Sequence, residues 1–269
     1  MVALLADFQH RLLMFVLVVG TLTPIEMTIT QEKHSLKGRM LGVLYWAIWT
    51  AFVMAAAQLF SLINPPSLVT WYLRTPWAGP WEYVIAPVLA ALVMDGYFYF
   101  HHRVQHAVPL FWRFHAAHHS IRELNAINSY HHPFDDFIKG FISMIPLAFI
   151  SVHPMNAVPA LALIFALHPA YLHSPIKADL GPLRAVFGDN RFHRIHHSTD
   201  PRHFDKNFGG LSTIWDRLFG TAYWPAKDEW PEVGLAEIDQ PRSVREWFSL
   251  PWRMKPRRGY STTSIANEE

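Results

Sequence analysis

With 51% hydrophobic and 16% charged residues, and with the apolar residues gathered into long runs, this chain of 269 residues is too apolar for an ordinary soluble protein and indicates an integral membrane protein. The formal net charge is only +2, and no basic stretch is interleaved with aromatic residues, which argues against nucleic-acid binding. Because the chain has no cysteine, disulfides, thiolate metal sites and iron–sulfur clusters are excluded.

Three apolar runs in the first hundred residues predict membrane helices. The first, at residues 12–23, is short and is followed by Glu26, but no small-x-small cleavage pattern comes after it, so we expect a retained helix rather than a signal peptide. The second, at residues 40–63, has about 24 residues without a charge, enough to cross a hydrocarbon core of roughly 30 Å. The third, at residues 81–100, leads directly into the first cluster of histidines.

A fourth apolar region, at residues 137–172, is interrupted at His153-Pro154 and by further prolines. It predicts either two tilted spans or a re-entrant hairpin, and both return the chain to the side that it left. The expected fold is all-α, with about four transmembrane helices, or three plus the hairpin, and a cytosolic helical cap. We expect one domain over residues 1–269, with a histidine-rich core at about 85–225 and a polar, Pro-rich surface tail at 226–269.

Fifteen of the 17 histidines lie between positions 101 and 203, and most of them fall into three blocks with helical spacing. Residues three or four positions apart share a helix face, so each block presents its imidazoles in one direction. Eight imidazoles are twice the number that closes a single structural zinc site, which favours two metal ions over capping or solvent-facing histidines. The block histidines are His102, His106, His115, His118, His119, His193, His196 and His197.

Asp95 lies on one stripe of the third run with Tyr99, His102 and His106, at positions i, i+4, i+7 and i+11. A carboxylate within a membrane span is costly unless it is paired. We expect it either to fix a ligand imidazole or hold Arg103 from outside the ligand set, or to make a helix-packing hydrogen bond.

Basic residues predict the orientation of the chain. If the first three runs all span, the loop with Lys33, Lys37 and Arg39 lies on the same side as the histidine blocks, and the opposite side has little beyond Arg11 and Arg74. The positive-inside rule then places the metal site and the C-terminus in the cytoplasm and the N-terminus outside.

The blocks HxxxH, HxxHH and HxxHH, in a chain with several apolar spans, resemble those of the fatty acid hydroxylase and sterol desaturase superfamily of membrane di-iron oxygenases. The resemblance extends to Trp112-Arg113-Phe114-His115 in the second block and to Asn207-Phe208-Gly209 after the third. It also includes the closing segment, Trp215-Asp216-Arg217-Leu218-Phe219-Gly220-Thr221, and covers roughly residues 85–225.

This resemblance implies two Fe ions, with Zn possible in purified protein, that use O₂ to hydroxylate a C–H bond of a lipid. The lipid is expected to be a sterol or terpenoid, a carotenoid, a fatty acyl chain or an ornithine-type lipid. An external donor, ferredoxin or a cytochrome b5-like protein, is expected because the chain has no CxxCH, cysteine cluster or GxGxxG motif. Asp95 would assist O₂ activation as a catalytic acid. The protein is expected in the bacterial inner membrane.

The resemblance also makes His173 the expected ninth ligand, although Pro175 stands where the family shows asparagine. The roles of three other histidines stay open. His132 either hydrogen-bonds to a ligand from outside the ligand set or is structural, and His168 is more typical of a packing residue. His203 is a candidate for hydrogen bonding to a ligand from outside the set.

Three other functions remain open. One is a lipid desaturase of the same class. Another is a zinc-dependent membrane hydrolase, since imidazoles bind Zn²⁺ more tightly than Fe²⁺, but the chain has no HExxH motif with a general-base glutamate. The last is a non-catalytic metal-binding or transport protein, in which ligands would follow a path through the membrane rather than form one cluster.

Overall fold

The computed structural model describes residues 2–63, 71–74, 79–139, 142, 150–153, 159–178 and 180–254. Parts of the fourth apolar region and the last part of the predicted tail, residues 255–269, lie outside the described residues.

Three long helices form the membrane part of the protein: α1 (Val2–Thr28), α2 (Leu36–Ile63) and α3 (Ala86–Ala107). The last is preceded by a π-helical turn, η1 (Trp81–Ile85). Three stretches are long and apolar enough to cross a membrane, namely Leu5–Thr28, Leu36–Ala56 and Trp81–Ala107. The three predicted spans are therefore confirmed, and many of their large apolar side chains are exposed, as expected of surfaces that face lipid.

The first helix extends beyond its apolar run at both ends, and Glu26 is neutralised near its C-terminal end. This carboxylate is buried, pairs with Arg39 of α2 and accepts a hydrogen bond from the backbone N–H of Ala126. A buried charge with both a counter-ion and a hydrogen bond avoids most of the cost of desolvation.

The fourth apolar region is broken up in the described part of the chain. It contains a short helix at residues 133–139, the strand β2 (Ile150–His153) and α6 (Pro159–Leu172). The apolar stretch of α6, Leu163–Leu172, is too short to cross roughly 30 Å of hydrocarbon, so no fourth helix of spanning length occurs among the described residues. The strand pairs in parallel with β1 (Trp71–Arg74), and this two-stranded sheet is an addition to the expected all-helical fold.

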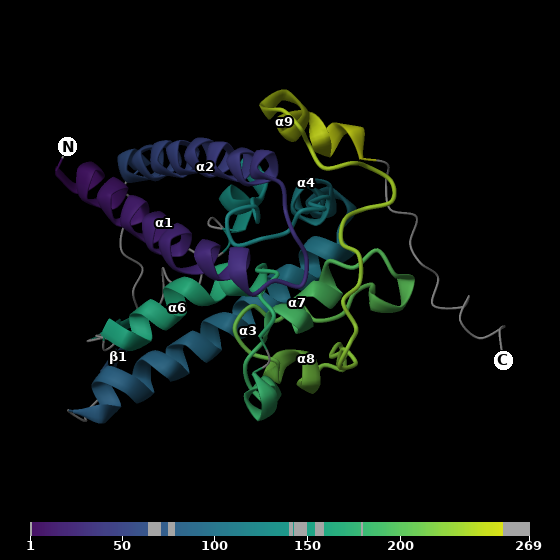
Figure 1. Ribbon diagram of the computed structural model, residues 1–269. Helices are drawn as coiled ribbons and strands as arrows, with labels where there is room; N and C mark the ends of the chain where they lie inside the picture. Colours follow the sequence, from purple (N-terminus) through teal and green to yellow (C-terminus); the bar gives the residue numbers. More distant parts are fainter. Residues whose placement is uncertain are drawn as a thin grey trace.

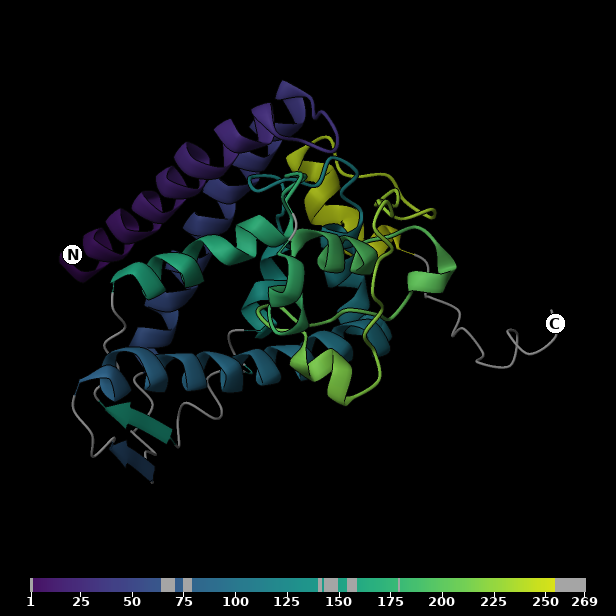
Figure 2. The same ribbon diagram turned by 60° about the horizontal axis from the view of Figure 1, so that its bottom comes forward.

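The cap is built from short helices around the C-terminal end of α3 (Figures 1 and 2). In chain order these are α4 (Pro109–His119), η2 (Gly181–Ala185), α7 (Asn190–His196), η3 (Pro201–His203), α8 (Ile214–Leu218) and α9 (Val244–Arg253).

The segment predicted as a surface tail is part of the core up to residue 254, which corrects that expectation. Ser243 caps α9 by accepting a hydrogen bond from the backbone N–H of Glu246, and the apolar face of this helix packs on α4. Trp247 is fully buried, with its ring 4.6 Å from Tyr45 and 5.8 Å from Tyr130.

The loop between α1 and α2 lies beside the histidine blocks, as the parity of the spans predicts. Arg194 of α7 donates to both carboxylate oxygens of Glu32, at 2.8 and 2.9 Å, and the backbone N–H of Gln31 donates to Pro175. The basic residues of this loop therefore lie on the same side as the histidines.

Close contact between α3 and α8 depends on Gly96. A Cβ at this position would lie 2.5 Å from the Trp215 ring, whose indole N–H donates to Leu92 of α3. We expect Gly96→Ala to destabilise the fold by about 1–3 kcal/mol through overpacking. Gly20→Ala in α1, where nothing lies within 4 Å, is the matched control and should be neutral or slightly stabilising. Thermal unfolding in detergent compares the two variants, and equal midpoints would contradict the contact.

Candidate metal centre

The three histidine blocks and His173 converge, and their nine imidazoles form two neighbouring groups. Within each group the ring nitrogens that could bind a metal all lie within 4.8 Å of one another. The five-histidine group is His102, His106, His115, His119 and His196. The four-histidine group is His118, His173, His193 and His197.

Each HxxHH block contributes histidines to both groups. This differs from the expectation that all histidines of a block point in one direction. In α4, His115 and His119 are four residues apart and join the five-histidine group, whereas His118 points to the other group. Consecutive residues are rotated by about 100° around a helix, so His118 and His119 cannot point the same way. The third block divides in the opposite sense, with His196 alone in the five-histidine group.

Hydrogen bonds to backbone carbonyls fix the tautomer of four of these rings. The Nδ1 atom of His102 lies 2.9 Å from the carbonyl oxygen of Phe208, and that of His196 lies 2.8 Å from that of Lys206. His118 and His173 contact the carbonyls of Tyr130 and Pro169 in the same way. Because a carbonyl can only accept, Nδ1 carries the proton and Nε2 keeps a lone pair directed into the group.

The inward nitrogens are arranged as ligands of shared cations. The Nε2 atoms of His118 and His173 face each other at 3.2 Å, and those of His102 and His115 at 3.0 Å. Two such lone pairs repel unless a cation lies between them, and two ligands at right angles, each about 2.1 Å from an ion, are about 3.0 Å apart. The Nε2 of His196 is also buried, without a hydrogen-bond partner among the described residues. The residues therefore fit metal ions.

Burial keeps these rings in the form that binds metals. It lowers the pKa of His118, His119, His193, His196 and His197 well below the usual value, helped by the neighbouring imidazoles, and lowers the pKa of His173 to about 4. All six are neutral at pH 7, the state in which imidazole is a ligand.

Asp135 and His131, which the sequence analysis missed, contact the clustered histidines. Asp135 lies 3.1 Å from Nδ1 of His115, 3.2 Å from Nδ1 of His131, and accepts from the Gln105 amide at 2.6 Å. His131 in turn stacks on His118 with ring centroids 3.9 Å apart. Although burial acts to raise it, the pKa of Asp135 is held well below its usual range by His115 and His131, so this carboxylate is an ionised acceptor. The i, i+4 spacing of His131 and Asp135 was the available signal.

Asp95 holds a loop, which corrects the expectation that it fixes a ligand imidazole or holds Arg103. Its carboxylate accepts from the backbone N–H groups of residues 210–212 at 2.6–3.1 Å and from the Ser212 hydroxyl at 2.7 Å. Asp216 holds the preceding N–H groups, at Phe208 and Gly209. Since the Phe208 carbonyl orients His102, Asp95 acts on the site through this loop.

The three histidines left open by the sequence lie outside both groups. His132 contacts the Phe248 carbonyl at 3.3 Å, and His168 contacts the Gly188 carbonyl at 2.9 Å. His203 lies 2.9 Å from the Ser198 hydroxyl and 3.1 Å from Glu229. Each ring has a partner that explains its place in the fold.

Two cavities approach the histidines. The membrane-side cavity, of about 590 Å³, lies between α1, α2 and α6 and is lined at one end by His131 and His173. The cap-side cavity, of about 170 Å³, is lined by His106, His119 and His196 of the five-histidine group and by the half-exposed Asp205, which contacts His106.

This fold and site define a helical integral membrane protein with a histidine cluster at one end of its membrane helices. The model of the fatty acid hydroxylase family matches residues 87–221, and the chain belongs to this family. That segment contains all nine clustered histidines.

The curated relatives are named as lipid hydroxylases and monooxygenases. The chain is 32% identical to an alkylglycerol monooxygenase of Danio rerio over 158 residues, which are 59% of this chain and 34% of that protein. It is 30% identical to an ornithine lipid hydroxylase of Rhizobium tropici over 207 residues, which are 73% of this chain and 60% of that protein. It is 27% identical to methylsterol monooxygenase 1 of Danio rerio over 185 residues, covering 64% and 62% of the two chains. The chain thus spans about a third of the first relative and about three fifths of the others, and no solved structure matches it.

The hydrogen bond between Asp135 and His115 leads to a prediction about metal affinity. Asp135→Asn removes the ionised acceptor that orients His115, and we expect it to weaken metal binding about 10- to 100-fold, as loss of such outer partners does elsewhere. Asp239→Asn, which alters an exposed ion pair with Arg122, is the control and should change nothing. Competition with a chelator, followed by metal analysis, measures both variants, and equal retention would contradict this role of Asp135.

Proposed function

We propose that this protein is a di-iron, O₂-dependent membrane oxygenase that hydroxylates a C–H bond of a lipid. The observation that carries the proposal is the convergence of nine imidazoles, eight of them buried, in two groups at one end of apolar helices. Membership of a family whose curated relatives are named as lipid hydroxylases supports the choice of reaction.

Each group would hold one ion, and the donor set favours iron. Imidazole suits iron and zinc alike, but the five histidines of one group exceed the four ligands that close a structural zinc site. Zinc is expected in protein purified without added iron, because imidazole sites favour it in raw affinity. When bound, the two iron ions would supply the redox chemistry that activates O₂ for insertion into a C–H bond.

The chain itself would bind the lipid, exclude water and hold the imidazoles. Carbonyl acceptors and Asp135 fix the rings, and Asp95 keeps the loop that orients His102 in place. The membrane-side cavity gives a lipid access to the four-histidine group without passing through water, whereas the cap-side cavity reaches the five-histidine group from the polar side.

Electrons would come from an external donor, a ferredoxin or a cytochrome b5-like protein, because the sequence contains no motif for a second redox group. We further propose that the cap faces the cytoplasm of a bacterial cell and that α1–α3 cross the inner membrane. The basic loop between α1 and α2 lies on the cap side, which supports this orientation.

The test is O₂ uptake by iron-loaded protein with a reduced donor and a lipid extract, followed by mass spectrometry. Hydroxylation adds one oxygen to a lipid, desaturation removes two hydrogens, and lipid cleavage without O₂ uptake would indicate the zinc hydrolase instead. Absence of O₂ uptake with every donor and lipid would refute the oxygenase.

A variant pair ties this activity to the clustered histidines. His193→Ala should lower turnover more than about a hundredfold, because losing a ligand exceeds the loss typical of outer partners. His168→Gln is the matched control, since an amide can keep the hydrogen bond to the Gly188 carbonyl, and it should retain activity. Turnover is measured as product formed per iron bound, and equal losses in both variants would contradict the assignment.

A further inference from the structure

The membrane-side cavity leads directly to the histidines. Its volume of about 590 Å³ falls within the range of small-molecule sites. Figures 1 and 2 show α1, α2 and α6 approaching one another on one side of the cap, and the cavity lies between them. His173 forms part of its wall, and the Nε2 atom of this ring belongs to the four-histidine group. A molecule in the cavity therefore meets that group first.

Charged side chains from two elements also line this cavity. Asp7 and Arg11 of α1 form an ion pair at 3.0 Å, and Asp136 and Lys139 of the helix at residues 133–139 form another at 2.9 Å. Trp49 of α2 links them, because its indole N–H donates to Asp136 at 2.6 Å and its ring centroid lies 5.9 Å from the Arg11 guanidinium carbon. We call these five residues the paired wall.

The paired wall has features of a binding surface as well as of helix packing. Asp7 and Arg11 belong to the Leu5–Thr28 span, and ionisable groups at membrane depth are costly and commonly mark substrate sites. Their side chains are not sealed between helices: Arg11 is 26% exposed, Lys139 33% and Asp7 40%, and all three line the cavity. A polar group in the cavity therefore lies against these charged side chains.

The net charge of the paired wall determines which lipid head groups it can bind. The wall carries two carboxylates and two cations, so its formal charge sums to zero. An anionic head group would compete with a carboxylate already on each cation, and a cationic one would compete with the cations. An uncharged or zwitterionic group can donate to the carboxylates and accept from the cations without displacing either pair.

The paired wall lies close to the clustered histidines. Asp136 directly follows Asp135, whose carboxylate lies 3.1 Å from Nδ1 of His115 and 3.2 Å from Nδ1 of His131. A polar group that binds to the wall is therefore near the histidines.

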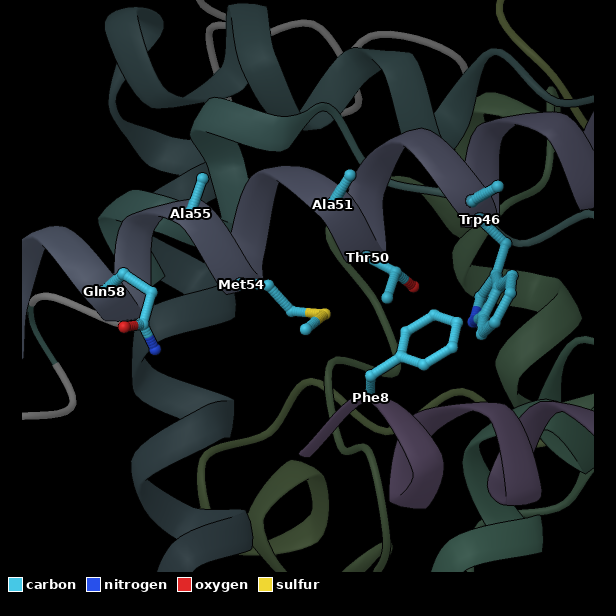
Figure 3. Close-up of a pocket in the computed structure, with 8 residues that line it drawn as sticks. Phe8, Trp46, Thr50, Ala51, Met54, Ala55 and Gln58 are labelled. Atoms are coloured by element: carbon cyan, nitrogen blue, oxygen red, sulfur yellow. The ribbon is translucent and has the colours of Figure 1, made fainter. Parts of the chain in front are cut away.

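A second cavity can take the hydrocarbon of the same molecule. It has a volume of about 470 Å³, lies between α1 and α2, and shares Trp46 with the membrane-side cavity. Figure 3 shows Phe8 of α1 pointing toward the face of α2 that carries Trp46, Thr50 and Met54. Its lining is almost entirely apolar, which suits an alkyl chain.

We propose that these cavities bind a lipid with an uncharged or zwitterionic polar group, which hydrogen-bonds to the paired wall close to the clustered histidines. The alkyl chain occupies the cavity between α1 and α2. Oxidation of the bound lipid rests on the proposed function, whereas the binding preference does not.

Equilibrium binding to the purified protein in nanodiscs tests the preference with four probes that share a hexadecyl-length chain. These are hexadecylglycerol, hexadecylphosphocholine, palmitate and hexadecyltrimethylammonium. We expect the first two to bind at least about tenfold more tightly than the two that carry a net charge. Equal affinity for all four would overturn the inference.

Two substitutions of the paired wall should shift the preference in opposite directions. Asp136→Asn leaves the wall one positive charge in excess and should raise the affinity for palmitate at least about fivefold relative to hexadecylglycerol. Lys139→Met keeps the apolar stem, leaves one negative charge in excess, and should favour the ammonium probe instead. Arg122→Gln, on an exposed ion pair outside the cavity, is the matched control and should leave the ranking unchanged.

A purely structural role of the wall would weaken all four probes together, or lower the unfolding temperature, without changing their ranking, and this result would overturn the inference. Binding that follows the predicted ranking without any O₂-dependent product would instead refute the proposed function and leave the subsite standing. Hydroxylation of a lipid, with no effect of the two substitutions on head-group preference, would refute the subsite and leave the proposed function standing.

Discussion

The structure depends on the direction in which each buried imidazole holds its proton. Nine rings share one small volume, and a ring with the wrong tautomer would point an N–H where a lone pair is needed. The Phe208, Tyr130, Pro169 and Lys206 carbonyls and the Asp135 carboxylate fix the tautomers of five of the nine rings, because none of these groups can donate. Phe208, Tyr130 and Lys206 lie in irregular loops, and Pro169 lies in the last turn of α6, where carbonyls have no intrahelical partner.

Holding those carbonyls in place requires the long-range contacts of the cap. The Phe208 carbonyl lies in a loop whose backbone N–H groups are bound by Asp95 of α3 and Asp216 of α8. The Tyr130 carbonyl belongs to a residue packed against Tyr45 and Trp247, which come from the two ends of the chain. Packing and polar contacts remote from the histidines thus determine the chemistry at their inner nitrogens.

Sequence spacing predicted which histidines would meet, since i, i+3 and i, i+4 positions lie on neighbouring stripes of a helix. Even His173 was expected beside the blocks, although only from a family resemblance. The same reasoning could not assign the role of Asp95, because its partners lie about 115 residues away along the chain and no local pattern identifies them. His131 and Asp135 were missed because Pro133 between them hides the helical spacing. The amphipathic pattern at residues 244–253 indicates a helix but does not show that it covers α4.

The position of α9 in the chain has a consequence for the order of assembly. All nine clustered histidines have been synthesised by residue 197, but the helix that covers α4 begins only at Val244. A nascent chain that already contains every imidazole therefore lacks the lid on the second histidine block, and its α4 is still open to water. The cover of the second histidine block is therefore completed only after every one of its imidazoles has been synthesised.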